Sequence, residues 1–589
     1  MDGIPLNDYP RPQMVRNGYL SLNGTWKCCI TKHSLKADSK RNITVDTVYE
    51  GDIVVPFSPE AKYSGVNHIL MPDEAITYNL SFDIQEGFLN EITLIHFDAV
   101  DYICEVYLNG NLLTRNEGGY LPFEVDVSSI IKEGTNRLDV IVTDPTDTLS
   151  QPRGKQKLKN GGIFYTPISG IWQSVWLETV PRGYVKSIKI DTDIDEKTVT
   201  VHADTELDEF FVSVIDKQDV VYQGLCDKDK KIIFKMDNIR MWSPEDPYLY
   251  NLEITAGTDV VKSYFGMRKF SIVKDEFGYS RLALNNDVYF HNGVLDQGYY
   301  PDSIYTPKTD EDMVKDIKLV KKLGFNMIRK HIKIEPLRWY YHCDRLGILV
   351  WQDIVNGGSQ YKFSTVAALP FVGINLDDTN YKAFGREDAY YKQRFEDDLS
   401  KYVRHLYNCV SLCQWTLFNE GWGQFDSVRL TDVLRNLDKT RYIDSTSGWH
   451  EQEDSHSDFY SRHIYFTKIA FPKAKKLSNK VMALTEFGGY AMKTPSHMYS
   501  PEKAFGYKLY KDRETLQKAY EKLFKKQVIP YIKKGLSACV YTQLSDVEEE
   551  VNGLVTYDRQ ILKFDSQRVK AVNNIVNKMN MDERVKWKE

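Results

Sequence analysis

The stretch TDEDMVKDIKLVKKLGFNMIRKHIKIEPLRWYYHCDRLGILVWQD, residues 309–353, decides the fold class because it alternates helix and strand signals twice. Thr309 is suited to cap a helix that Gly324 ends, and the apolar residues 325–329 predict a buried strand. A second helix signal follows, and then a second apolar strand at 348–353. The apolar residues that share one face of the first helix are Met313, Ile317 and Val320.

Three later apolar stretches end in polar residues in the same way. They are VSLCQWTLFNE (410–420), KVMALTEFGG (480–489) and LSACVYTQLSD (536–546). Alternation of strands and helices throughout residues 274–589 predicts a (β/α)8 TIM barrel. In such barrels the chemistry sits at the C-terminal ends of the strands, so polar residues at those ends are the first candidates for a site.

Residues before 274 have a different pattern, in which short alternating strands are separated by turn residues. ICEVYLNGNLL (103–113) predicts a β-hairpin with an Asn-Gly turn. We predict a jelly-roll-like β-sandwich over residues 1–182 and an immunoglobulin-like β-sandwich over residues 183–273. Within the second, WSPEDPYLY (242–250) predicts a fixed turn before an edge strand.

Composition excludes several classes of partner. The net charge of -6 gives no basic surface for nucleic acid or anionic lipid. The first residues lack a basic-then-apolar signal, and no run approaches membrane-span length, so we expect a cytoplasmic protein without a membrane partner.

The eight cysteines are scattered, which favours reduced buried thiols over a zinc site. Aromatic residues make up 13% of the chain and suit surfaces that stack on sugar rings, although core packing must account for most of them.

Two glutamates stand out at the ends of predicted barrel strands. Glu420 ends QWTLFNE and Glu486 ends MALTE, and a glycine-opened loop follows each. Two carboxyl groups at the top of one barrel indicate paired-carboxylate chemistry such as glycoside hydrolysis. A separation of about 5–5.5 Å gives retention of anomeric configuration, and a wider gap gives inversion. The alternative for either residue alone is a buried ion pair.

The residues around these glutamates resemble glycoside hydrolase family 2, which includes β-galactosidases, β-glucuronidases and β-mannosidases. NCVSLCQWTLFNE (408–420) is similar to the family's acid/base segment, with Cys409-Val410 where members often have His-Pro, and TEFGG (485–489) is similar to its nucleophile segment. Motifs that resemble the sugar-binding sandwich, the immunoglobulin-like domain and the junction after it are LNGTW (22–26), VYLNG (106–110), SGIWQSVWLE (169–178), WSPEDPYLY and FGMRK (265–269).

The resemblance implies a retaining exo-β-glycosidase acting on a small-molecule or oligosaccharide β-glycoside. Glu420 would be the general acid/base and Glu486 the nucleophile. Asn419 would bind the sugar 2-hydroxyl, and His463 and Tyr465 would lie beside the nucleophile. We expect no organic cofactor and no metal. The N-terminal sandwich would pack on the barrel and lend a loop to the pocket or a contact for a homo-oligomer.

Other strand ends supply further substrate-binding candidates. The residues singled out are His291, Asp296 and Gln297 after the first barrel strand, Asp353 after the third, Trp449 after the fifth, and Tyr541 on the last. For His463 and Tyr465 the alternative is a core or rim role, and Trp351 beside Asp353 fits a core ring equally well. The His-rich and acidic stretch HEQEDSHSD (450–458) has ligand types for a metal, but a solvated loop is the favoured interpretation.

The sugar is less well indicated than the reaction. The family's β-glucuronidases grip the sugar carboxylate with an Asn-x-Lys element, and Glu550 and Asn552 occupy those positions here. An acidic residue there repels a uronate, so a neutral β-galactoside is the first choice.

A β-hexuronide such as a galacturonide is second, held by Arg329, Lys330 or Lys333, whose alternative is pairing with the barrel's own acids. The segment GILVWQD resembles the β-mannosidase branch of the family, so a β-mannoside is a further alternative substrate. From other classes, a non-hydrolytic sugar-binding protein and a barrel metallohydrolase remain as alternatives.

Overall fold

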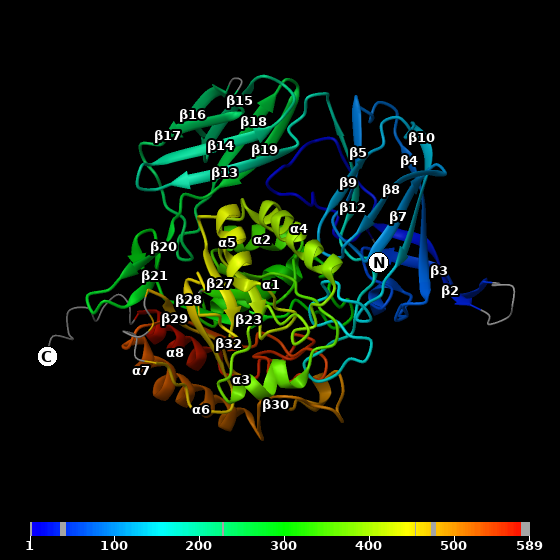
Figure 1. Cartoon of the computed structure of the whole chain (residues 1–589). Coiled ribbons are helices and arrows are strands. Elements are labelled where there is room, and N and C mark those ends of the chain that lie inside the picture. The colour runs from blue at the N-terminus through cyan, green and yellow to red at the C-terminus, as the bar shows by residue number, and fades with distance from the viewer. Residues whose placement is uncertain are drawn as a thin grey trace.

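The computed structural model has the predicted three-part architecture (Figure 1), with a jelly-roll-like sandwich, an immunoglobulin-like sandwich and a TIM barrel. Figure 1 shows the two sandwiches side by side on one flank of the barrel. The described residues are 3–35, 43–226, 229–453, 455–472, 477 and 479–578.

The N-terminal sandwich packs two main antiparallel sheets around one apolar core. The four-stranded sheet has the order β1 (Tyr19–Ser21), β12 (Val175–Val180), β5 (Ile92–Phe97) and β9 (Phe123–Asp126). The six-stranded sheet has the order β3 (Ile43–Val55), β2 (Gly24–Leu35), β4 (Glu74–Ile84), β10 (Gly134–Thr143), β7 (Ile103–Leu108) and β8 (Asn111–Glu117). A short pair joins β6 (Val100–Asp101) to β11 (Gly170–Ile171). The predicted hairpin is confirmed as β7 and β8.

The immunoglobulin-like sandwich has a second apolar core of its own. One sheet contains β13 (Ser187–Asp193), β14 (Thr198–Asp204) and β17 (Lys231–Lys235). The other has the order β16 (Asp219–Cys226), β15 (Phe210–Asp216), β18 (Tyr250–Ala256) and β19 (Asp259–Phe265). The prediction of an edge strand after residues 242–250 was wrong, because β18 pairs on both sides and β19 forms the edge. The two prolines precede the strand and leave its N–H groups free to pair.

Eight parallel strands lie in chain order around the barrel, and among the described residues every neighbouring pair except the fifth and sixth forms a hydrogen-bonded ladder. They are β23 (His291–Asp296), β24 (Met327–Lys330), β25 (Leu349–Asp353), β26 (Leu412–Asn419), β27 (Tyr442–Ser447), β28 (Phe459–Ile464), β29 (Val481–Gly488) and β32 (Leu536–Thr542). Strands β27 and β28 close the ring, and the N–H of Asp458 donates to the carbonyl of Ile443 at 2.9 Å.

Helices cover the outside of the barrel. The longer ones are α1 (Asp310–Lys322), α2 (Leu337–Leu346), α4 (Ala389–Leu406), α5 (Ser427–Leu437), α6 (Arg513–Leu523) and α8 (Ser566–Lys578), with the short α3 (Leu369–Phe371) and α7 (Ile529–Ile532) between them. As predicted, the Thr309 side chain caps α1. Among the described residues, no helix lies between β27 and β28 or between β28 and β29. No helix in the described part of the chain is long and apolar enough to span a bilayer.

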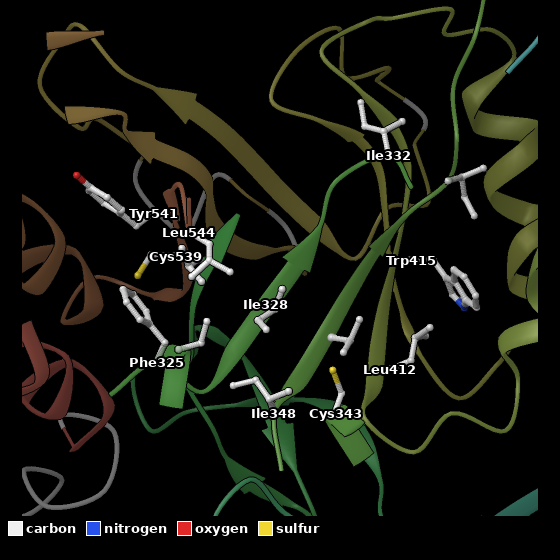
Figure 2. Packing of buried hydrophobic residues seen from close by; sticks show 14 of the residues in the cluster. Phe325, Ile328, Ile332, Cys343, Ile348, Leu412, Trp415, Cys539, Tyr541 and Leu544 are labelled. Carbon is white, nitrogen blue, oxygen red and sulfur yellow. The ribbon is translucent and has the colours of Figure 1, made fainter. Parts of the chain in front are cut away.

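Alternate residues of each barrel strand face opposite sides, and this phase decides which side chains reach the barrel interior. Figure 2 shows Ile328, Trp415 and Tyr541 in the apolar layer, which lies between the strands and the helices. Arg329, next to Ile328, faces the interior. A small sheet of β20 (Phe270–Lys274), β21 (Ser280–Leu284) and β22 (Asp287–Val288) packs Leu282 and Leu284 into the apolar cluster at the N-terminal ends of the strands. The short strands β30 (Tyr490–Met492) and β31 (Lys508–Tyr510) pair beside the opposite end.

Candidate active site

The two predicted carboxylates meet at the C-terminal end of the barrel. One oxygen of Glu420, one oxygen of Glu486 and one ring nitrogen of His463 all lie within 4.8 Å of one another. Glu420 directly follows β26 with a φ of +50°, a left-handed conformation that residues other than glycine rarely adopt. Its N–H donates to the carbonyl of Ser447 at 3.0 Å, so the backbone turn that carries the carboxylate is tied to β27.

His463 lies between the two carboxylates, and so beside Glu486, where the sequence places it. Its Nδ1 is 2.8 Å from Glu420 Oε1 and 3.6 Å from Glu486 Oε2, and its Nε2 is 3.1 Å from the hydroxyl of Ser447. The ring requires a glycine below it, because a Cβ on Gly448 would lie 2.5 Å from His463 Cγ. The imidazole is therefore held in one orientation from both sides.

Glu486 is surrounded by groups that favour its charged form. Arg329 Nη1 donates to Glu486 Oε1 at 3.2 Å, and the Tyr465 hydroxyl donates to Oε2. Burial by itself raises the pKa of Glu486, but the charges of His463, Arg329 and His331 and the hydrogen bond from Tyr465 outweigh burial and lower the pKa to about 2. Glu486 is therefore a carboxylate at neutral pH.

Glu420 has the opposite environment. Burial raises its pKa above the ordinary value, and the negative charge of Glu486 acts in the same direction. The hydrogen bond and charge of His463 and the charge of Lys155 oppose this rise without cancelling it. A pair of carboxyl groups whose pKa values are pushed apart is the arrangement in which one serves as acid and the other as base or nucleophile.

Arg329 holds several of the predicted residues together. Its Nε and Nη2 donate to the two oxygens of Asp353 at 3.0 and 3.1 Å, and Nη2 also donates to Asn419 Oδ1 at 2.8 Å. Asp353 accepts a further bond from His331 at 2.7 Å, so its oxygens are engaged by the protein. The amide nitrogen of Asn419 is buried without a partner among the described residues and is free to donate to a ligand.

Three of the predicted substrate-binding residues lie elsewhere. His291 begins β23 instead of following it, and its Nδ1 accepts from Trp351 at the apolar end of the barrel. Tyr541 faces the helices, where it packs against Tyr520 and Phe487. The prediction for His291 was wrong because the strand begins at this residue, and the prediction for Tyr541 was wrong because the sequence does not reveal the phase of a strand that is buried on both faces.

Lys330 is also outside the site, on the helix side of β24. Its ammonium pairs with Asp296 at 2.5 Å and with Glu335 at 2.7 Å, and it lies over the ring of Trp339 on α2. Lys333 shares Glu335 at 2.9 Å. The alternative given for these cations, pairing with the barrel's own acids, is the correct one.

The rim of the site is aromatic. Trp449, a predicted candidate, is half-buried with its ring 6.3 Å from that of His463, and it contacts Phe371. Tyr465 stacks on Tyr507 at 3.6 Å, and the exposed ring of Phe466 packs against Tyr507. Neither Tyr507 nor Phe371 was predicted, because both lie in long segments between barrel strands and not at the end of a strand.

The polar loop at 450–458 is engaged in structural contacts. His450 accepts from the N–H of Leu376 and lies 2.7 Å from the carbonyl of Thr365. Glu451 pairs with Lys480, and His456 pairs with Asp432. Asp454 lies outside the described residues.

Glu550 and Asn552 form a polar network beside the site. Asn552 donates to Glu550 Oε1 at 2.8 Å, and the Tyr165 hydroxyl donates to the other carboxylate oxygen. Gln543 donates to Asn552 at 2.8 Å, and Gln297, a predicted strand-end candidate, donates to Gln543 at 2.8 Å. Tyr165 belongs to the N-terminal sandwich, so the first domain contributes to this network as expected.

Family models match nearly the whole chain. The sugar binding domain of the glycosyl hydrolases family 2 matches residues 20–181, the model described as glycosyl hydrolases family 2 matches residues 183–268, and the family's TIM barrel domain matches residues 307–577.

Curated relatives with sequence similarity include two kinds of enzyme. A β-galactosidase of Thermoanaerobacter pseudethanolicus is 24% identical over 449 residues, which cover 71% of this chain and 54% of the relative. A putative β-glucuronidase of Formosa agariphila is 25% identical over 350 residues, which cover 56% of this chain and 38% of the relative. The matched regions thus span about half of these relatives' length or less.

Solved structures share the fold over the whole chain. A β-D-glucuronidase from Dictyoglomus thermophilum has a TM-score of 0.72 at 19% identity, and the match covers 96% of this chain and 98% of that one. A β-galacturonidase from Eisenbergiella tayi bound to galacturonate has a TM-score of 0.66 at 17% identity, covering 96% and 99%.

Proposed function

The chain belongs to glycoside hydrolase family 2, and we propose that it is a retaining β-glycosidase that removes a terminal β-linked sugar. One observation carries the proposal. Glu420 and Glu486 bring carboxylate oxygens within 4.8 Å of each other, and their pKa values are shifted in opposite directions. Close approach of the two carboxyl groups supports retention over the wider gap of an inverting enzyme, and it suits direct attack on the anomeric carbon.

In the first step, Glu486 attacks the anomeric carbon while Glu420 gives its proton to the glycosidic oxygen. The bond to the leaving group breaks, and a glycosyl ester forms on Glu486. In the second step, the now ionised Glu420 takes a proton from water, and the water oxygen displaces Glu486 from the sugar. Asn419, whose side-chain amide nitrogen has no partner among the described residues, would bind a sugar hydroxyl during both steps.

The test is hydrolysis of 4-nitrophenyl β-glycosides of galactose, glucose, mannose, glucuronate and galacturonate. We expect Glu486→Ala to lower kcat for the cleaved sugar by about 10³-fold or more. Glu276→Ala, which changes an exposed glutamate far from the site, is the matched control and should behave as wild type. NMR of the first product formed should show the β-anomer.

Three results would contradict the proposal. An α-anomer as the first product would exclude retention. Loss of activity on adding a chelator would favour the metallohydrolase alternative, since Glu420, His463 and Glu486 also offer atoms that could ligate a cation. Absence of turnover together with sugar binding would favour a non-hydrolytic binding protein.

A further inference from the structure

A loop of the N-terminal sandwich is seated directly on the barrel next to the site. The N–H groups of Arg153 and Gly154 both donate to the carbonyl of Asn356 at 3.0 Å. Gly154 has a φ of +60°, and a Cβ at that position would lie 2.8 Å from the carbonyl oxygen of Ile332. Ile332 and Asn356 follow barrel strands β24 and β25, whose Arg329 and Asp353 belong to the site. The loop therefore has a fixed position relative to the carboxylates.

The next residue of this loop, Lys155, is a buried cation without a counter-ion. Its side chain is 7% exposed, and its Nζ lies 5.5 Å from the ring centroid of Tyr165 and 5.6 Å from that of Trp422. In the part of the chain that the structure describes, its ammonium forms no ion pair and no hydrogen bond. The buried Lys330 and Lys333, in contrast, share Glu335. A lysine that is mostly buried and has no acidic partner among the described residues can bind an anion.

Lys155 lies on the substrate side of the barrel. Trp422 comes two residues after Glu420, and its N–H donates to the carbonyl of Asn419 at 2.9 Å. The pKa of His331, the partner of Asp353, is lowered to about 4, first by burial and next by the charge of Lys155. The ammonium is therefore close to both the acid/base candidate and the Arg329–Asp353 cluster.

Cations on this loop lack acidic partners, whereas nearby acids are already occupied. Arg153 lies 5.3 Å from the ring of Tyr361 and bonds only carbonyl oxygens, and Lys157 Nζ lies 3.8 Å from the ring of Phe164. Neither forms an ion pair among the described residues. The nearby acids already have other partners. Glu550 accepts from Tyr165 and Asn552, and Glu548 accepts from Asn160 and Thr166. Glu549 accepts from the N–H of Gly162 and pairs with Lys503. The loop thus presents positive charge in a chain whose net charge is -6.

We propose that Lys155 binds a negatively charged group, a carboxylate or a sulfate ester, on the sugar that binds beside Glu420. This inference rests on the proposed glycosidase function and names its substrate class as β-glycosides of acidic sugars, in place of the neutral galactoside that the sequence favoured. A carboxylate or sulfate oxygen accepts a charge-assisted hydrogen bond from the ammonium and replaces its missing counter-ion. A neutral hydroxymethyl group in the same place leaves the cation uncompensated.

Matched substrate pairs test this directly, because glucuronide and glucoside, or galacturonide and galactoside, differ only at C6. A galactoside 6-sulfate is the second anionic probe. We expect Lys155→Met to raise KM for the preferred acidic glycoside about tenfold to hundredfold. Its kcat, and the KM for the neutral partner, should change by less than about threefold. Lys155→Arg should restore much of the loss, and Lys27→Met, at an exposed lysine of the same sandwich, should have no effect.

The outcomes separate the two sources of negative charge. A preference for uronides alone assigns a carboxylate, and a preference for the 6-sulfate alone assigns a sulfate ester. An equal loss on neutral and acidic sugars in Lys155→Met would overturn the proposal and give Lys155 a packing role. A wild-type enzyme with equal kcat/KM for neutral glycosides and their acidic partners would also overturn the proposal.

A binding measurement keeps this inference separate from the proposed activity. Calorimetry would measure the binding of glucuronate, galacturonate, glucose and galactose to the Glu486→Gln variant. The same measurements would be made on the double variant that also carries Lys155→Met. Tighter binding of the acids that disappears in the double variant supports Lys155 even if no glycoside is cleaved. Equal binding of acids and neutral sugars would reject Lys155, whatever the catalytic result.

Discussion

Glu420 and Glu486 occupy one pocket but differ in charge because the basic groups around them are distributed unevenly. Arg329 reaches Glu486 at 3.2 Å and Tyr465 donates to the same carboxylate, whereas the hydrogen bond that Glu420 accepts comes from His463, at 2.8 Å. A cation bonded to one carboxylate stabilises its ionised form, and that negative charge in turn favours the protonated form of the other. The division of roles therefore follows from where Arg329 lies.

This arrangement predicts the pH dependence of the reaction. The acid/base candidate must be protonated for the first step, so kcat/KM should fall as pH rises through the raised pKa of Glu420. The lowered pKa of Glu486, about 2, places loss of the nucleophile at strongly acidic pH. Activity should therefore extend further above pH 4.5 than an ordinary glutamic acid would allow.

The measurement is a pH profile of kcat/KM with substrates whose leaving groups differ in basicity. For a very good leaving group, which needs no proton, Glu420→Gln should remove the alkaline limb while keeping measurable activity. An alkaline limb that survives in this variant would assign it to a group other than Glu420.

Strand phase explains which site residues the sequence could predict. Glu420, Glu486 and Asn419 stood out because each is polar at the end of an apolar strand. In β24 and β32 every residue is buried, so hydrophobicity does not distinguish the interior face from the helix face. Tyr541 and Lys330 were therefore assigned to the wrong side, although the barrel and both sandwiches were predicted correctly.

Lys155 could not be predicted because its partners are distant in sequence. The alternation of basic residues at 153, 155 and 157 was visible, but nothing in the chain before folding links this loop to Trp422 or His331. Such a contact depends on how the sandwich docks, which local patterns do not specify.

The docked loop itself yields a prediction. Gly154→Ala should push the loop away from Ile332 because the new Cβ would lie 2.8 Å from a backbone oxygen. We expect a loss of stability of about 1–3 kcal/mol and a raised KM for the cleaved substrate. Thermal unfolding and steady-state kinetics measure these two effects.

Gly134→Ala is the matched control for this experiment. Gly134 lies in the same sandwich with a φ of +77°, but a Cβ there meets nothing within 4 Å. Gly134→Ala should lower the stability, because alanine is strained at a positive φ, but it should leave KM unchanged. Identical kinetics for the two variants would mean that the loop's position does not matter to the site.

On the scale of the whole molecule, an N-terminal segment joins the three parts. Arg16 forms two bonds to Asp259 of the immunoglobulin-like sandwich at 2.8 and 2.9 Å and contacts Glu178 of the first sandwich at 3.2 Å. Gln13 donates to the carbonyl of Asn408, beside the barrel, at 2.7 Å. These polar contacts add to the apolar packing that joins the two sandwiches to the barrel.

Arg16→Met should be costly because it leaves Asp259 buried without its cation. We expect a loss of about 3 kcal/mol, seen as an earlier midpoint in chemical unfolding. Arg137→Met, which removes a 65% exposed partner of Asp139, should cost less than about 1 kcal/mol. Equal midpoints for the two variants would show that the junction contributes little to stability.

The seat of the sandwich loop on the barrel has a consequence for how such a protein changes over generations. The carboxylates that break the bond are encoded in one domain, and the cation proposed to select the sugar is encoded in another, more than 260 residues away in the sequence. Substitutions in residues 151–157 can therefore change the substrate specificity during evolution while the catalytic carboxylates stay the same. Exchange of this short segment between relatives offers the same route to an engineer.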